Sequence, residues 1–292
     1  HEQWMEDYTT IPDSSLEKSF LEEMASPERK FRYTSYSVND YPASEVREYA
    51  NENAELFRRM RVSRISLKAD EQEAEEIYSQ LENSPERFEE LARNHSSDSY
   101  AEKGGDMGWV RYHELLGSLE NESDVDTVFS LDQGEFTALL ETSFGWSIYR
   151  CDNEAQEADL SDEETISDIR SYLITNERGR VEDYFIERAS AVAASAREDG
   201  FSEAVLNAGR EVQETGYFPI NYGGAFFLKR IGEEGEAGVL QQASGNERVL
   251  RTLFSIEEGG ITEPFVLGTS VVVANASDER EAQEEAVQRI DG

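Results

Sequence analysis

The sequence predicts an α+β protein, and three observations lead to this fold class. In the middle third, short runs rich in β-branched and aromatic residues alternate with amphipathic helical stretches. Glycine-rich turns separate these runs, and a weakened copy of the same pattern recurs in the last third. With 292 residues, of which 38% are hydrophobic, the chain can form two or three domains with cores of their own.

The first 61 residues predict a helical and strand segment. Up to about Met24, apolar residues follow helical spacing. The run KFRYTSYSV then alternates like a strand, and Pro42 with Ser44 opens a helix that carries its apolar residues on one side. We therefore interpret residues 1–61 as an N-terminal segment ahead of the first domain.

Residues 62–152 predict one compact α+β domain of the order β-α-α-β-α-β-β. VSRISL at 62–67 is the first strand, and Asp70 with Glu73 forms a capping-box pattern at the start of the next helix. A second helix starts at Pro85, and the loop KGGDMGW leads into a short strand. A helical patch, the run VFSLDQGEF and the strand GWSIYR complete the domain.

Residues 153–200 predict an acidic linker followed by a long helix. From Asp152 to Glu164 there are seven acidic residues and no basic one, a composition typical of an exposed segment. Apolar residues at helical spacing follow, and Gly200 is placed to end the helix.

Residues 201–292 predict a degenerate second copy of the middle domain. LFSIEEGGIT at 253–262 matches VFSLDQGEFT at 128–137, and two further pairs of motifs, one before and one after it, keep the same order. The run IGEEGEAGVLQQASGN at 231–246 looks like an insert, and we expect it to form a flexible surface loop.

The charge of the chain excludes one class of partner. It contains 63 acidic and 27 basic residues, for a formal net charge of −36. Such an excess opposes binding to nucleic-acid phosphates or to an anionic membrane surface, and a solvated acidic surface is its simplest meaning. We therefore expect no nucleic-acid partner.

No cofactor or metal site is expected. The single cysteine, Cys151, ends an apolar strand and reads as a core residue. His1, His95 and His113 show no metal-ligand spacing. No run of eighteen apolar residues is present. Because the chain begins with His1 rather than Met, we expect a fragment or mature product and leave room for an upstream membrane anchor.

Three motifs give residues 62–151 a specific likeness to a known family. FEELARNHSSDSYAEKGGDMGW, VFSLDQGEF and TSFGWSI occur in this order. The region resembles the parvulin-type (PpiC/rotamase) peptidyl-prolyl isomerases, the rotamase domain of periplasmic foldases of the PpiD/SurA kind. The likeness implies a parvulin-like domain with a small antiparallel or mixed sheet. It would be flanked by helical chaperone segments and by the degenerate second module.

The resemblance also implies which residues form the catalytic site. Asp98 falls where the family places a cysteine or aspartate opposite the substrate carbonyl, although an Asx-turn or helix cap explains Asp98 as well. Thr142 keeps the family's hydroxyl. Arg64 and Ser147 stand where the family carries two histidines. The family's histidine pair orients the aspartate or cysteine, so its loss predicts weak or absent isomerase activity.

The same resemblance implies a set of substrate-binding residues. Two leucines would contact the proline ring, a phenylalanine would line the wall, and further apolar residues would contact unfolded segments, although ordinary core packing competes with each role. The set is Leu115, Leu119, Phe129, Met107, Trp109 and Phe144.

The function implied is assistance to protein folding. The first hypothesis is an extracytoplasmic or periplasmic factor that binds unfolded or proline-containing polypeptides with little isomerase activity. The alternative is an active isomerase of X-Pro bonds in exported proteins. A structural subunit whose grooves are filled by its own chain is the third.

Overall fold

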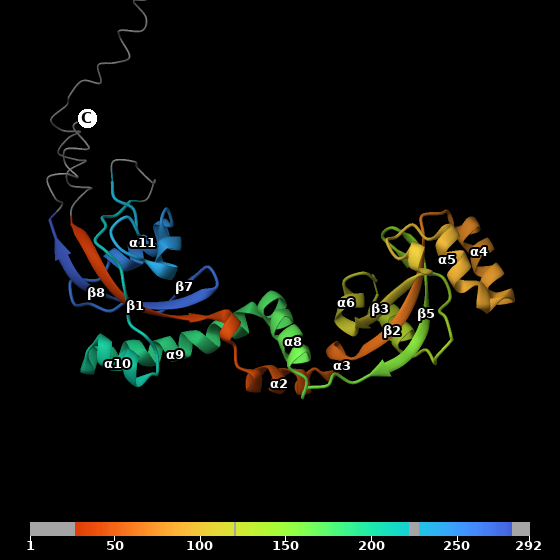
Figure 1. Cartoon of the computed structure of the whole chain (residues 1–292), viewed down its shortest axis with the longest axis horizontal. Coiled ribbons are helices and arrows are strands. Elements are labelled where there is room, and N and C mark those ends of the chain that lie inside the picture. The colour runs from red at the N-terminus through yellow and green to blue at the C-terminus, as the bar shows by residue number, and fades with distance from the viewer. Residues whose placement is uncertain (1–26, 120, 222–227, 282–292) are drawn as a thin grey trace, which may run out of the picture. The chain divides into compact units, whose positions relative to one another are not determined.

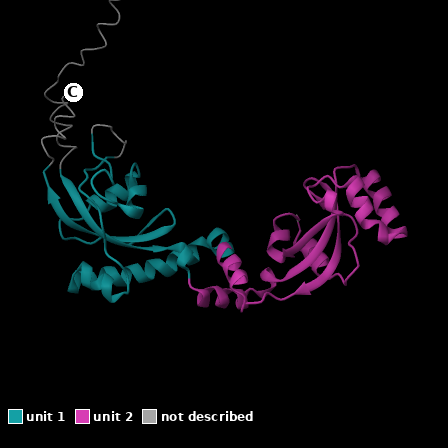
Figure 2. Ribbon diagram, viewed as in Figure 1, with its two compact units in different colours: residues 1–41, 172–292 teal, residues 42–171 magenta. Residues whose placement is uncertain are grey.

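The computed structural model describes residues 27–119, 121–221 and 228–281 (Figure 1). The helix expected up to Met24 lies outside these residues. The chain forms two compact units, which are described separately (Figure 2). Unit 1 comprises residues 1–41 and 172–292, and unit 2 comprises residues 42–171.

Unit 2 is built on a four-stranded antiparallel sheet with the order β3-β2-β5-β4. The register places Arg64 opposite Tyr149 and Ser66 opposite Ser147. Because side chains two apart on a strand share a face, these four lie on the same side of the sheet. The strands are β2 (Arg59–Leu67), β3 (Asp106–Arg111), β4 (Leu140–Thr142) and β5 (Gly145–Gln156).

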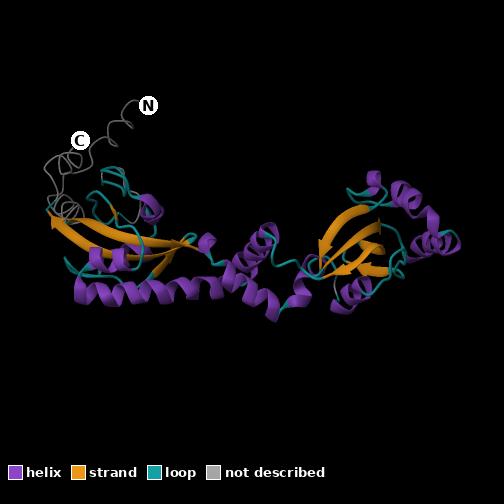
Figure 3. Ribbon diagram, turned by 60° about the horizontal axis from the view of Figure 1, so that its bottom comes forward, coloured by secondary structure: helices purple, strands orange, loops and turns teal. Residues whose placement is uncertain are grey.

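Helices lie on both faces of this sheet (Figure 3), and each face has its own hydrophobic core. On one face Ile65, Leu67 and Ile148 pack with residues from α4 and α5. On the other, Met60, Val62 and Tyr149 pack with residues from α6 and α7. The Asp70 side chain accepts a hydrogen bond from Glu73 N, as the capping pattern predicts. The helices of unit 2 are α2 (Ala43–Glu52), α3 (Ala54–Phe57), α4 (Glu71–Asn83), α5 (Phe88–His95), α6 (Tyr112–Leu116) and α7 (Glu122–Phe129), with 3-10 turns η2 (Pro85–Arg87) and η3 (Ala101–Lys103).

Unit 1 repeats this architecture. Its sheet has the order β6-β1-β8-β7, and all three of its pairings are antiparallel. Helix α9 packs against β1 and β8, and α11 contributes to the core on the side of Phe31 and Val272 (Figure 1). The elements are β1 (Glu28–Ser37), η1 (Val38–Asp40), α9 (Arg178–Asp199), α10 (Phe201–Asn207), β6 (Gln213–Glu214), η4 (Gly238–Ala243), α11 (Glu247–Phe254), β7 (Phe265–Leu267) and β8 (Ser270–Arg280).

The hydrogen bonds of the two units match position by position. In unit 2, Thr137 N donates to Tyr149 O and Tyr149 N donates to Thr137 Oγ1. In unit 1, Thr262 N donates to Ala274 O and Ala274 N donates to Thr262 Oγ1. The repeat predicted from the sequence therefore extends to individual backbone and hydroxyl contacts.

Three features differ from the sequence interpretation. Residues 28–37, which we had grouped with the N-terminal segment, form the strand β1 next to β8, so unit 2 is inserted within the module that contains β1. The surface loop expected at 231–246 is wrong, because η4 runs through it and buries Leu240 and Ala243 completely. The expected single long helix is α8 (Glu163–Asn176) and α9, separated at Glu177, and Gly200 with φ +91° ends α9.

Candidate functional site

A cavity of about 370 Å³ in unit 2 brings together the four polar residues predicted for catalysis. Arg64 comes from β2, Asp98 from the loop after α5, Thr142 from β4 and Ser147 from β5. Phe144, in the turn between β4 and β5, also lines the cavity and is 75% exposed. The remaining lining residues are mostly polar: Ser66, Lys68, Ser97, Gly117, Ser118, Ser143 and Tyr149.

The loop that carries Asp98 is anchored to the sheet. Ser97 N donates to Ser66 O at 2.7 Å, and Ser66 N donates to Ser96 Oγ at 2.9 Å. These bonds tie the loop to β2 beyond the point where its pairing with β3 ends. They fix the position of Asp98 relative to Arg64, which lies two residues before Ser66 on β2.

Asp98 is fully engaged by its neighbours. Arg64 Nε and Nη2 both lie 2.8 Å from Asp98 Oδ2. Asp98 Oδ1 accepts hydrogen bonds from Ser96 Oγ at 3.1 Å and from Tyr100 N at 3.0 Å. The bond from Tyr100 N closes an Asx-turn, so Asp98 takes part in a turn and in an ion pair with Arg64 at the same time.

The Arg64 guanidinium lies between two aromatic rings. Its Cζ is 5.7 Å from the ring centre of Tyr100 and 5.9 Å from that of Tyr149, and Nη1 lies 3.5 Å from Tyr149 Oη. Burial alone lowers the pKa of Arg64, but the hydrogen bonds with Tyr149 and Asp98 outweigh it and raise the pKa above its ordinary value. Arg64 therefore stays a cation over the whole physiological range.

Sequence reasoning missed Tyr149 and Tyr100. Tyr149 follows Ser147 by two residues in the strand GWSIYR, so strand alternation could have placed it on the same face. Tyr100 had no comparable signal, because it lies in an irregular loop.

The structure places most of the predicted substrate-binding set outside the cavity. Leu115, Leu119 and Phe129 are 2%, 5% and 4% exposed and belong to the core against β2 and β5, so none of them lines the cavity. Met107 packs against the same core. Trp109 is 42% exposed on β3, where the Arg59 guanidinium lies 4.9 Å from its ring centre. Leu115, on α6, and Leu119, in the turn after it, are buried because they lie with Tyr112 on the apolar side that this segment packs against the sheet.

The corresponding positions of unit 1 carry no polar site. The register places Tyr33 opposite Ala274 and Ser35 opposite Val272, as Arg64 lies opposite Tyr149 and Ser66 opposite Ser147. Tyr33, Val272 and Ala274 are all buried in the core of unit 1, and the Tyr33 hydroxyl donates to Ala237 O. The candidate site is therefore specific to unit 2.

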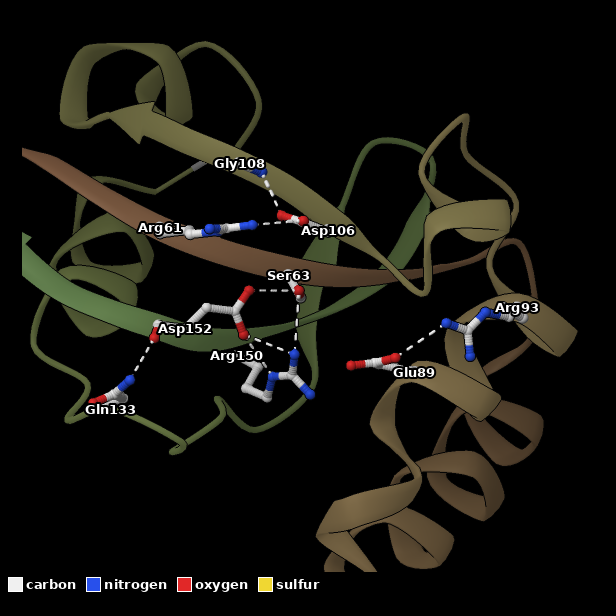
Figure 4. Close-up of polar contacts among 9 residues, drawn as sticks. All are labelled: Arg61, Ser63, Glu89, Arg93, Asp106, Gly108, Gln133, Arg150 and Asp152. Atoms are coloured by element: carbon white, nitrogen blue, oxygen red, sulfur yellow. Dashed lines mark hydrogen bonds and ion pairs between the residues drawn. The ribbon is translucent and has the colours of Figure 1, made fainter.

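The opposite face of the unit 2 sheet carries a second polar cleft, of about 440 Å³ (Figure 4). Its charges are compensated: Arg61 lies 2.9 Å from Asp106, and Arg150 lies 2.7 Å from Asp152. The hydrogen bond from Arg61 is the main cause that lowers the pKa of Asp106. Ser63 Oγ donates to Asp152 at 2.7 Å. The Arg61–Asp106 pair joins β2 to β3 and the Ser63–Asp152 bond joins β2 to β5, and we assign this cleft no ligand.

Metal and membrane features are not found in the described residues. Within residues 27–119, 121–221 and 228–281, no three His, Cys, Asp or Glu side chains are grouped as metal ligands. Nor does any helix in these ranges have the length and apolar character needed to cross a membrane.

Comparisons with known proteins identify the fold that carries the cavity. The family model described as the PPIC-type PPIASE domain matches residues 56–153. A second family model, described as a third domain, matches residues 214–281. The first matched segment contains the whole sheet of unit 2 except the last residues of β5.

One relative matches a longer part of the chain, and two others have names that describe a role. An uncharacterized protein of Treponema pallidum (strain Nichols) is 24% identical over 197 residues, which cover 68% of this chain and 77% of the relative. Foldase protein PrsA of Bacillus subtilis (strain 168) is 33% identical over 111 residues, covering 38% of this chain and 36% of PrsA. Chaperone SurA of Bordetella avium (strain 197N) is 32% identical over 107 residues, covering 37% of this chain and 20% of SurA.

The matched part of the chain thus spans little more than a third of PrsA and a fifth of SurA. The family model and both named relatives point to the same kind of domain in this part of the chain. Residues 56–153 therefore match the PpiC-type (parvulin-type) peptidyl-prolyl isomerase domain, and this part of the chain is similar to segments of the chaperone SurA and the foldase PrsA.

Proposed function

We propose that this chain is an extracytoplasmic protein-folding factor that binds unfolded or exported polypeptides and has weak or no prolyl isomerase activity. The relatives named as a foldase and a chaperone support the general role. The ion pair between Arg64 and Asp98 is the observation that carries the proposal, because it occupies the polar centre of the cavity.

Prolyl isomerisation makes a specific demand on such a cavity. The amide resists rotation by roughly 18–20 kcal/mol, and a catalyst must favour the twisted amide over both planar forms. That requires polar groups free to face the amide when it twists. Both carboxylate oxygens of Asp98 are already hydrogen-bonded within the protein, and Arg64 cannot exchange a proton near neutral pH.

The walls of the cavity support the same conclusion. A proline ring needs an apolar surface, but the leucines expected to supply it, Leu115 and Leu119, are buried in the core. Phe144 is the large apolar side chain at the cavity, and it lies at the exposed rim. The cavity thus favours a polar or main-chain contact with an extended polypeptide over an enclosed proline site.

An active isomerase is the second candidate. The convergence of Arg64, Asp98, Thr142 and Ser147 on one cavity favours it, because these are the positions that the family resemblance assigns to the catalytic site. The two candidate functions use the same fold and differ only in whether the cavity catalyses prolyl isomerisation.

Two measurements on the same protein preparation separate them. We expect stoichiometric amounts of the chain to suppress aggregation of a chemically unfolded client during dilution. A protease-free assay on a proline peptide should show little or no acceleration of isomerisation, with an ordinary active parvulin as the control. Turnover comparable to that control would favour the second candidate, and failure in both assays would reject both.

The extracytoplasmic location is part of the proposal and rests on the family likeness. Fractionation of cells that express the native gene, with markers for each compartment, tests it. We expect the protein outside the cytoplasm, and recovery with cytoplasmic markers alone would contradict this.

A further inference from the structure

Unit 1 has an apolar pocket of about 400 Å³ that the proposed site does not use. It lies among β1, α9 and α10, on the side of the sheet where the Tyr36 and Phe185 ring centres are 5.9 Å apart. Small side chains form most of its wall. The lining residues are Tyr36, Arg188, Ala191, Val192, Ser195, Ala204, Asn207 and Ala208.

Arg188 lines this pocket and Arg210 lies behind its Tyr36 wall, and neither has a carboxylate partner among the residues that the structure describes. Arg188 Nη1 donates to Tyr184 O at 3.0 Å, and its guanidinium lies over the Tyr184 ring. Arg210 donates to Ser35 O and lies 4.7 Å from the ring centre of Tyr36. In a chain with 63 acidic residues, two such arginines beside one pocket are unusual.

Two other arginines on α9 form ion pairs with carboxylates. Arg178 lies 2.6 Å from Glu182, and Arg197 lies 2.5 Å from Glu263. The positive charges of Arg210 and Arg188 both act to lower the pKa of Tyr36, although burial is the larger effect and raises it. Arg188 and Tyr36 both line the pocket, and Arg210 lies over the Tyr36 ring, so the geometry puts both positive charges near this wall of the pocket.

We infer that this pocket binds the C-terminal residue of a polypeptide, with its α-carboxylate at Arg188 and Arg210 and an apolar side chain against Val192 and Ala204. Guanidinium groups match the planar geometry of a carboxylate, and chain ends are a known recognition element. The volume is at the small end of the range for ligand pockets and suits one or two side chains.

The charge of the chain narrows the choice of ligand. A net charge of −36 repels polyanions, so a ligand with a single carboxylate on an otherwise neutral body is repelled least. Ser195 is not counted in the site, because its hydroxyl already donates to Asp199 at 3.3 Å. The inference rests on the proposed binding of polypeptides, but its residues lie in unit 1, away from Arg64 and Asp98 in sequence and in a different sheet.

The test compares two labelled peptides of one uncharged sequence ending in leucine. One has a free C-terminal carboxylate and the other a C-terminal amide, and fluorescence polarisation measures their binding to the whole chain. We expect the free acid to bind at least tenfold more tightly. Arg188→Gln should remove this preference, and Ala191→Phe at the exposed rim should weaken binding of the acid.

Arg197→Gln is the matched control, because Arg197 lies on α9 but pairs with Glu263 outside the pocket. This variant should keep the full preference for the acid. Equal affinity for acid and amide, or an unchanged preference in Arg188→Gln, would overturn the inference. Binding of laurate without binding of the acid peptide would also overturn it, since the occupant would then be a fatty acid. Suppression of client aggregation together with equal affinities would reject this inference and leave the proposed function standing.

Discussion

Arg64 and Asp98 form a partly buried ion pair in which two guanidinium nitrogens lie 2.8 Å from the same carboxylate oxygen. The side chains are 18% and 14% exposed. This pair connects the central strand β2 to the loop after α5, so it contributes to the stability of the cavity as well as to its charge.

Removing one partner of this pair should destabilise unit 2. Asp98→Ala leaves a cation with little access to water and also removes the acceptor for Tyr100 N, so we expect a loss of about 2 kcal/mol. Urea denaturation measures it. Glu89→Ala is the control, because the exposed pair of Glu89 with Arg93 should contribute no more than about 0.5 kcal/mol. Equal losses in the two variants would contradict the structural role of the pair.

The equivalent threonines of the two units should contribute similar amounts to the free energy of unfolding. Thr137 and Thr262 are 2% and 1% exposed, and each hydroxyl accepts a backbone N–H. Substituting either by valine leaves that N–H unpaired and should cost about 1–3 kcal/mol. Thr127→Val, at an exposed helix position, and Thr252→Val, at a half-buried one, are the controls and should cost much less. A large loss from only one of the buried threonines would argue against an equivalent repeat.

The start of β1 is held by a buried carboxylate. Glu28 is completely buried, with Lys229 3.0 Å and Arg280 2.7 Å from its oxygens. Glu28→Gln should therefore destabilise unit 1 by about 3 kcal/mol, because two cations lose their buried partner. Glu279→Gln, in a more exposed pair with Arg29, should have a smaller effect in the same thermal or urea unfolding experiment. If Glu28→Gln unfolds like the wild type, the strand is held by other contacts.

Cys151 offers a readout for unit 2 alone. Its side chain is completely buried, and burial, with smaller effects from nearby carboxylates, raises the pKa of its thiol to about 11. At pH 8 the thiol is protonated and inaccessible, so alkylation by iodoacetamide should be slow and should accelerate only as urea unfolds unit 2. Glu28→Gln should not change this labelling. Alkylation of the native protein at the rate of a free cysteine would contradict the buried position.

The candidate site could be predicted largely because its parts lie in continuous motifs. Arg64, Ser147 and Thr142 sit on or beside strands whose alternation is visible in the sequence, and Asp98 precedes the glycine loop. Once the strands pair in the family's order, these residues converge. Tyr100 was missed because an irregular loop has no periodicity that fixes the direction of a side chain.

The remaining differences come from long-range pairing and from the ambiguity of apolar residues. Nothing local in residues 28–37 indicates that they pair with residues 270–280. Likewise, Leu115 reads equally well as core or as groove lining, and the packing of α6 on the sheet decides between them. Glycine-rich composition at 231–246 indicated a loop, whereas the burial of Leu240 places η4 in the core.

We propose that a fixed cation and a hydroxyl at positions 64 and 147 leave a binding cavity without catalytic turnover. A protease-free isomerisation assay of the wild type beside the Arg64→His, Ser147→His double variant tests this proposal. We expect little or no acceleration by the wild type and at least a tenfold gain in the variant. A wild type that already catalyses as fast as an ordinary parvulin, with no gain in the folded variant, would contradict it.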